Sequence, residues 1–291
     1  MTRIAVLATT AAVLAAAAPA QAATGAAYLL GRQQHSGGIA EAGSTRASVS
    51  LTEWAAMGLR AAGRSPGRAH RPGGRTMATY LGRHAGRWRN AFSLERGILA
   101  VVAIGRNPRA FAGRNLVTAL RARVGGGGRI GSTLNSTYWG VIALRAAGVP
   151  APRRSLALIR ASQHSGGGYS WSSSAAPDGD DTSAAVMALR AAREPCGARS
   201  VTRAFGYLDT AQTAANGYAL LPGAPANSQS TSWAIQARHT CHLRNRKALA
   251  WLAARQLPSG AFNYQPGVTT TPAWVTGQVL PAINGRSYPV R

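Results

Sequence analysis

A short phrase recurs six times along this 291-residue chain and restricts its fold more than any other feature. Each copy begins with a small or polar residue, often Ser-Thr, and continues into a helix rich in Ala, Leu and Trp. Successive copies lie 41 to 49 residues apart. The aligned positions are Trp54, Arg96, Trp139, Ala184, Trp233 and Trp274. A period of this length is typical of repeated supersecondary units that pack against one another.

Each of these helices is preceded by a second, more basic helical segment. Apolar residues at three- and four-residue spacing indicate that the leading segments are amphipathic, whereas the helices at the aligned positions are apolar nearly all round and must be buried. Gly-rich loops join the two, and the Ser, Thr or Asp after each loop is placed to cap the next helix. The leading segments are expected near residues 26–34, 75–84, 114–124, 153–163, 200–212 and 246–256.

Six such hairpins predict an all-α fold, the α/α toroid, in which six apolar helices form an inner ring and six amphipathic helices wrap it. An open solenoid would expose apolar faces at both ends and would need polar capping repeats. The first and last units resemble the middle ones, which favours the closed ring. We therefore predict a single toroid domain of six helical hairpins over residues 23–291.

Residues 1–22 have the pattern of a secretory signal peptide. Arg3 gives a basic start, residues 4–18 form an apolar run, and residues 20–22 form a small-x-small cleavage site. A retained transmembrane helix is the weaker alternative, because the run is short and no basic stop follows it. We expect a secreted protein that is cleaved near Ala22.

The charge is strongly positive, with 33 Lys and Arg residues against 8 Asp and Glu residues. Lys247 is the only lysine, so a GC-rich coding bias explains the arginines at least as well as a selected function does. A distributed positive field favours anionic surfaces such as lipid headgroups or envelope polymers. Nucleic acid is not expected as a partner, because the chain carries no recognisable DNA-binding or RNA-binding motif.

Two cysteines, Cys196 and Cys241, each follow the end of a repeat helix. In an exported chain they are expected to pair, since consecutive repeats could bring them together. The loop they would close, of about 45 residues, stabilises the fold by roughly 4 kcal/mol in the chain-entropy model. The metal alternative rests on His239, Cys241 and His242, which lack a fourth ligand and the usual paired spacing. Neither a metal nor another cofactor is expected.

Four segments resemble the prenyltransferase and squalene-oxidase repeats of the terpenoid cyclase-like superfamily. They are residues 163–171 (QHSGGGYSW), 178–183 (DGDDTS), 227–233 (NSQSTSW) and 272–280 (PAWVTGQVL). The resemblance is nearest to secreted single-toroid bacterial members, and more distant to the C-terminal domain of squalene-hopene cyclases and the α-domains of cobalamin carriers. It implies an α/α toroid but leaves the activity open, because these proteins do unrelated things on one scaffold.

The run Asp178-x-Asp180-Asp181-Thr182 matches the acid motif of class II terpene cyclases. The resemblance implies that Asp180 would protonate an alkene or epoxide, with Asp178 and Asp181 tuning it. That chemistry needs a carboxylic acid kept neutral by burial and facing an aromatic-lined cavity. Because other repeats have Ser, Thr or Asn at this place, we favour the alternative that Asp180 or Asp181 caps the helix. A cation or ligand site is a third possibility.

Three features argue against a cyclase: the chain has one barrel, its aromatic residues are sparse, and Tyr169 interrupts the Gly-x-Trp spacing of cyclase repeats. The sequence lacks the zinc ligands of protein prenyltransferases and the Cys and Gln motif of a thioester. It also lacks the β-rich domain that cobalamin carriers pair with their toroid. A glycosidase needs two carboxylates across a groove, and only Glu41 and Glu53 could join Asp181. The candidates for a ligand cavity are Tyr169, Trp171, Trp54, Trp139, Trp233 and Trp274. The four aligned tryptophans could equally be packing between helices.

The sequence therefore predicts a secreted toroid that binds a ligand or partner at the cell surface without catalysis. Its partner would be a small apolar molecule, a surface protein, an anionic envelope polymer or a lipid surface. The alternative function is that of a class II terpene cyclase, a mutase-type isomerase, with Asp180 as its general acid.

Overall fold

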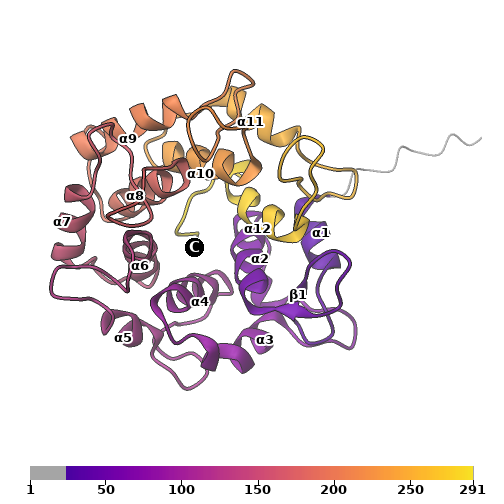
Figure 1. The fold of residues 1–291 in the computed structure, drawn as a ribbon. Helices are drawn as coiled ribbons and strands as arrows, with labels where there is room; N and C mark the ends of the chain where they lie inside the picture. Colours follow the sequence, from indigo (N-terminus) through magenta and orange to yellow (C-terminus); the bar gives the residue numbers. More distant parts are fainter. Residues whose placement is uncertain (1–23, 291) are drawn as a thin grey trace, which may run out of the picture.

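Twelve α-helices alternate between two concentric rings in the computed structural model, which describes residues 24–290 (Figure 1). The inner ring consists of α2 (Val49–Ala61), α4 (Ala91–Ala103), α6 (Leu134–Ala146), α8 (Gly179–Ala191), α10 (Ser228–His239) and α12 (Pro272–Ile283). The outer ring consists of α1 (Gly25–Gly31), α3 (Met77–His84), α5 (Leu116–Arg121), α7 (Arg153–Ala161), α9 (Arg199–Thr210) and α11 (Arg246–Ala253). Each inner helix contacts the next, and α12 contacts α2, so the ring is closed.

The predicted α/α toroid of six hairpins is thereby confirmed. The expected signal peptide, residues 1–22, lies outside the described residues. The remaining elements are a small antiparallel pair, β1 (Ile39–Ala40) and β2 (Ala47–Ser48), and two 3-10 turns, η1 (Pro66–Arg68) and η2 (Ala85–Arg87). Within residues 24–290, no helix is both long and apolar enough to cross a bilayer.

Each of the first five inner helices begins five residues before its aligned position, and a polar side chain caps it there. Every one of these caps accepts a hydrogen bond from the backbone N–H three residues further on, which would otherwise be unpaired. The capping residues are Ser48, Asn90, Thr133, Asp178 and Asn227. In the fourth repeat the capping side chain is that of Asp178, not Asp180 or Asp181 as we expected from the sequence.

A glutamine and a threonine hold the Gly-rich loops between their two helices. The glutamine amide donates to a loop carbonyl four residues further on, at 2.8 to 3.2 Å, in four repeats: Gln33, Gln163, Gln212 and Gln256. The threonine hydroxyl of the inner helix accepts a loop N–H at 2.8 to 3.1 Å in five repeats: Thr52, Thr137, Thr182, Thr231 and Thr276. These turns end the outer helices up to three residues earlier than the hydrophobic pattern suggests. Thr182 thus has a structural role that its counterparts share.

Cys196 and Cys241 form the predicted disulfide, with their Cα atoms 5.7 Å apart. It links the turn after α8 to the turn after α10, which are consecutive inner helices. Nowhere in residues 24–290 do three His, Cys, Asp or Glu side chains gather closely enough to hold a metal ion.

The first repeat closes the ring by capping the last. Thr271 has a left-handed backbone (φ 43°) and gives α12 no side-chain cap. Instead, Glu41 of the β1–β2 turn accepts the N–H groups of Ala273 at 2.8 Å and Trp274 at 3.2 Å. The backbones of α2 and α12 also approach closely, since a Cβ at Gly58 would lie 2.5 Å from the carbonyl oxygen of a facing glycine.

Replacing Glu41 with alanine is expected to lower the free energy of unfolding by about 1–2 kcal/mol, the usual effect of losing a helix cap. Glu41→Gln, which keeps one acceptor oxygen but loses the charge, should cost about half as much. Urea unfolding of the three proteins measures both values. A Glu41→Ala protein as stable as the wild type would show that this carboxylate does not secure the ring closure.

Candidate functional site: the mouth of the ring

Three tryptophans from alternate inner helices meet at the centre of the ring. Trp54 on α2, Trp139 on α6 and Trp233 on α10 are each 6% exposed, and their ring centroids lie 5.1 to 6.2 Å apart. Such aromatic contacts add to the stabilisation that comes from burial. The six-fold repeat therefore converges on a packed aromatic cluster rather than on an open channel.

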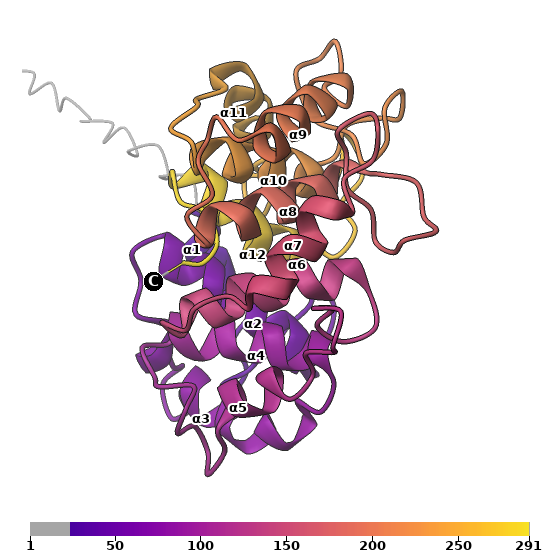
Figure 2. The ribbon, with the colours of Figure 1, turned by 90° about the vertical axis from the view of Figure 1, so that its left-hand side faces the viewer.

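The C-terminal segment fills the rest of the centre. It runs from the end of α12 into the middle of the inner ring (Figure 1). Tyr288 is fully buried there, with its ring centroid 5.9 Å from that of Trp54 and 5.4 Å from that of Trp139. Seen from the side, this segment lies on one face of the ring, and the long loop before α8 projects from the other (Figure 2). The ring is closed from the face where its inner helices end.

A cavity of about 220 Å³ remains at the opposite face, where the inner helices begin. We call it the mouth cavity. Its aromatic wall consists of Trp54, Phe92, Trp139, Trp171, Trp233 and Trp274. Its polar residues are Ser50, Glu95, Arg96 and Asn135. An apolar concavity with a few convergent polar groups is the usual form of a small-molecule site.

Glu95 is the one carboxyl group among the residues that line the mouth cavity. Its side chain comes from the first turns of α4 and is almost completely buried. The hydroxyl of Ser136 donates to Oε1 of Glu95 at 2.6 Å. Burial raises the pKa of Glu95 to about 8, and the Ser136 hydrogen bond and the charge of Arg96 offset this only in part. Glu95 is therefore mainly neutral at pH 7 and can donate a hydrogen bond.

Among residues 24–290, Arg96 is the only cation that lines the mouth cavity, and its charge is paired with that of Glu53. Its Nε lies 3.0 Å from Oε2 of Glu53, a buried carboxylate on α2 that also accepts the indole N–H of Trp88 at 2.6 Å. Burial raises the pKa of Glu53, while Arg96 and Trp88 act in the opposite direction. Glu53 does not line the cavity, so it positions Arg96 without facing a ligand.

The three aspartates lie beside the mouth cavity and not in its wall. Asp178 accepts the Asp181 N–H at 2.7 Å. Asp181 in turn accepts the side-chain amide of Asn135 at 2.5 Å, which connects it to the cavity rim. Burial and the neighbouring Asp178 raise the pKa of Asp181.

Asp180 points to the neighbouring inner helix. Its Oδ2 accepts the side-chain amide of Gln229 on α10 at 2.7 Å. Burial raises the pKa of Asp180 to about 6, offset in part by hydrogen bonds from Ser230 and Gln229. Asp180 thus lies at the junction of α8 and α10 and does not line the mouth cavity.

Five of the six aromatic candidates line the mouth cavity. Trp171 is 46% exposed and stacks on Phe92 with ring centroids 5.2 Å apart. Tyr169 lies elsewhere, fully buried and edge-on to Tyr138. Sequence reasoning missed Glu95 as a lining residue. The sequence does contain a clue to Glu95. In the first two repeats an acid, Glu53 or Glu95, immediately precedes the aligned position within a helix that is otherwise apolar.

Neither a family model nor a curated protein sequence matches this chain, but solved structures do. The type II terpene cyclase MstE from Scytonema, solved with geranylgeranyl dihydroxybenzoate, is 11% identical with a TM-score of 0.65, covering 90% of this chain and 95% of its own. A glycosidase is 14% identical with a TM-score of 0.63, covering 90% and 94%. A protein geranylgeranyltransferase-I from Candida albicans is 10% identical with a TM-score of 0.59, covering 81% and 83%.

These similarities identify the fold as an α/α toroid of the terpenoid cyclase-like type, as the sequence repeats predicted. At such low identity they carry no activity over to this chain, because one toroid scaffold supports cyclisation, glycoside hydrolysis and prenyl transfer in the three neighbours.

Proposed function

We propose that this protein is a non-catalytic binding toroid whose mouth cavity holds one small neutral ligand that carries hydroxyl groups, such as one sugar residue of a surface glycan. The observation that carries this proposal is the filled centre of the ring. With Trp54, Trp139, Trp233 and Tyr288 packed together, the cavity that remains is small and aromatic.

The size of the mouth cavity favours a single ring-shaped ligand. Its volume is about 220 Å³. Pockets for drug-sized ligands usually begin at roughly 300 Å³. A long isoprenoid would not fit unless the aromatic cluster opened.

The polarity of the lining favours a neutral ligand with hydroxyl groups. Glu95 is mainly uncharged at pH 7, and Arg96 is paired with Glu53. Together with Ser50 and Asn135, these side chains offer donors and acceptors around an aromatic wall against which the apolar face of a sugar could pack. Hydrolysis is not proposed, because a two-carboxylate mechanism needs a second acid across the cavity and only Glu95 lines it.

Delivery to the cell surface is part of the proposal and rests on the signal-peptide pattern of residues 1–22. The disulfide between Cys196 and Cys241 suits an oxidising compartment. Surface glycans would then be the ligands within reach.

Titration of the purified protein with a panel of monosaccharides and disaccharides, followed by tryptophan fluorescence, tests the binding site. At least one sugar should quench the fluorescence in a saturable way. Trp171→Ala should weaken this binding at least tenfold, because Trp171 is a half-exposed wall of the cavity. Trp251→Ala is the matched control, since Trp251 stacks on Arg255 of the outer ring and is not part of the cavity. Equal losses in both variants, or no saturable quenching by any sugar, would overturn the proposal.

The alternative function, a class II cyclase with Asp180 as acid, leads to a different result. Incubation with squalene and shorter isoprenoids should give no cyclised product from the wild type or from Asp180→Asn, because Asp180 contacts Gln229 outside the mouth cavity. Gas chromatography with mass spectrometry detects such products. A product formed by the wild type and lost in Asp180→Asn would establish the cyclase instead.

A further inference from the structure

A second cleft lies at the end of the ring opposite the mouth cavity. It has a volume of about 360 Å³ and lies between the last turn of α2, the turn η1 and the last turn of α4. The mouth cavity touches Ser50 in the first turn of α2, whereas this cleft touches Arg60 in the last. The two sites are therefore separate.

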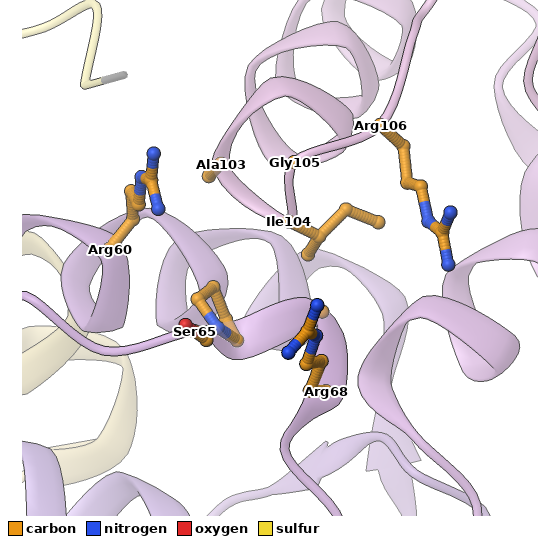
Figure 3. A pocket seen from close by; sticks show the side chains of 9 residues that line it. Arg60, Ser65, Arg68, Ala103, Ile104, Gly105 and Arg106 are labelled. Carbon is orange, nitrogen blue, oxygen red and sulfur yellow. The ribbon is translucent and has the colours of Figure 1, made fainter.

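Three arginines from three segments surround the cleft. Arg60 comes from α2, Arg68 from η1 and Arg106 from the turn after α4, and their guanidinium groups lie around the side chain of Ile104 (Figure 3). Among residues 24–290, no carboxylate lines the cleft. Among the described residues, none of these three side chains has a hydrogen-bond or ion-pair partner. Three unpaired guanidinium groups around one cavity create a strong positive potential.

Equivalent arginines in other repeats behave differently. Arg145 and Arg190 lie six residues after their aligned positions, as Arg60 does. Arg145 donates to the carbonyl of Ala191, the last residue of α8, and Arg190 donates to the carbonyl of Thr240, the residue after α10. By analogy, Arg60 would donate to a carbonyl at the end of α4, but it makes no such hydrogen bond.

The turn η1 packs against Ile104, the residue that follows α4. Gly67 packs so closely on α4 that a Cβ on it would lie 2.3 Å from the carbonyl oxygen of Ile104. This turn occupies the space beside that carbonyl and carries Arg68 to the edge of the cleft. A positive residue at a helix C-terminus is favourable for Arg60 in any case. The helix dipole does not account for the convergence of three guanidinium groups from separate segments.

We propose that this cleft binds a phosphate group, as a phosphomonoester or a phosphodiester. The planar guanidinium donates paired hydrogen bonds that match phosphate oxygens, and charge-assisted bonds of this kind are about twice as strong as neutral ones. The hydroxyl of Ser65 adds a donor, and Pro66, Ala103 and Ile104 provide an apolar surface for the organic part of the ligand. The site would attach the protein to a phosphate-bearing molecule while the mouth cavity stays open.

Calorimetric titration with inorganic phosphate and glycerol 3-phosphate tests the site. We expect saturable binding that weakens at least tenfold in Arg60→Gln or Arg106→Gln and at least thirtyfold in the double variant. Arg46→Gln is the control, because Arg46 is exposed in the β1–β2 turn near the start of α2 and has the same effect on net charge. This control should change the affinity less than twofold.

Two vesicle experiments identify the source of the phosphate. If binding to phosphatidylglycerol vesicles, but not to phosphatidylcholine vesicles, is lost in the double variant, the site takes a lipid headgroup. If only the binding of free glycerol 3-phosphate is lost, the ligand is soluble. The absence of saturable binding to either free phosphate probe, or equal weakening by Arg46→Gln, would overturn the proposal. None of these outcomes depends on whether the mouth cavity binds a sugar.

Discussion

Replacing Tyr288 with alanine is expected to lower the free energy of unfolding by about 3–5 kcal/mol, the usual effect of removing a buried aromatic side chain. Tyr288 is fully buried and packs against both Trp54 and Trp139, so its loss leaves a cavity at the centre of the ring. Urea unfolding, followed by circular dichroism, measures the change. The enlarged cavity should also bind a small apolar probe that the wild type does not bind.

Tyr288→Phe is the matched control for this experiment. The hydroxyl of Tyr288 is buried and has no hydrogen-bond partner among residues 24–290. Removing it should therefore leave stability unchanged or raise it by about 1 kcal/mol, because an unsatisfied buried polar group is costly. If Tyr288→Ala were as stable as the wild type, the C-terminal segment would not be packed in the ring centre.

Raising the pH from 5 to 8 is expected to destabilise the protein by about 1.4 kcal/mol per pH unit for each buried carboxyl group that is neutral when folded and ionised when unfolded. For Glu95, folding raises the pKa from 4.5 to about 8. Its contribution is fully present below about pH 4.5 and is lost as the pH rises towards 8. Asp180 and Asp181 change stability in the same direction, because burial raises their pKa values too.

Glu95→Gln isolates the contribution of one group. This variant keeps an acceptor for the Ser136 hydroxyl and cannot ionise, so it should be more stable than the wild type at pH 8 and should have a flatter pH dependence. Glu194→Gln is the control, since the ion pair with Arg160 lowers the pKa of Glu194. Urea unfolding at pH 5, 6, 7 and 8 would contradict our assignment if Glu95→Gln and the wild type had parallel pH profiles.

The ring could be predicted from the sequence because its determinants are local and repeated. A capping residue, an apolar helix and a Gly-rich loop recur along the chain. Each of these features forms the same local structure wherever it occurs. The pairing of Cys196 with Cys241 followed from the same regularity. The ends of the outer helices did not, because glutamine side chains such as Gln33 turn the chain before the hydrophobic pattern stops.

The contents of the ring could not be predicted, because they depend on contacts between distant segments. Nothing in the repeat indicates that Tyr288 returns to the centre, or that Glu41 caps a helix more than 200 residues away. The Asp178–Asp181 run is the most informative case. Its spacing resembles a catalytic motif, yet Asp178 caps α8 and Asp180 contacts α10, while the buried acid that faces the aromatic cavity is Glu95 from another repeat.

The measurement that tests this account most directly is a crystal structure of the protein soaked with the sugar that quenches its tryptophan fluorescence. We predict electron density for the sugar against Trp171 and above Glu95, with Tyr288 packed between Trp54 and Trp139. An open channel through the ring, with the C-terminal segment outside it and a long apolar ligand inside, would contradict the account.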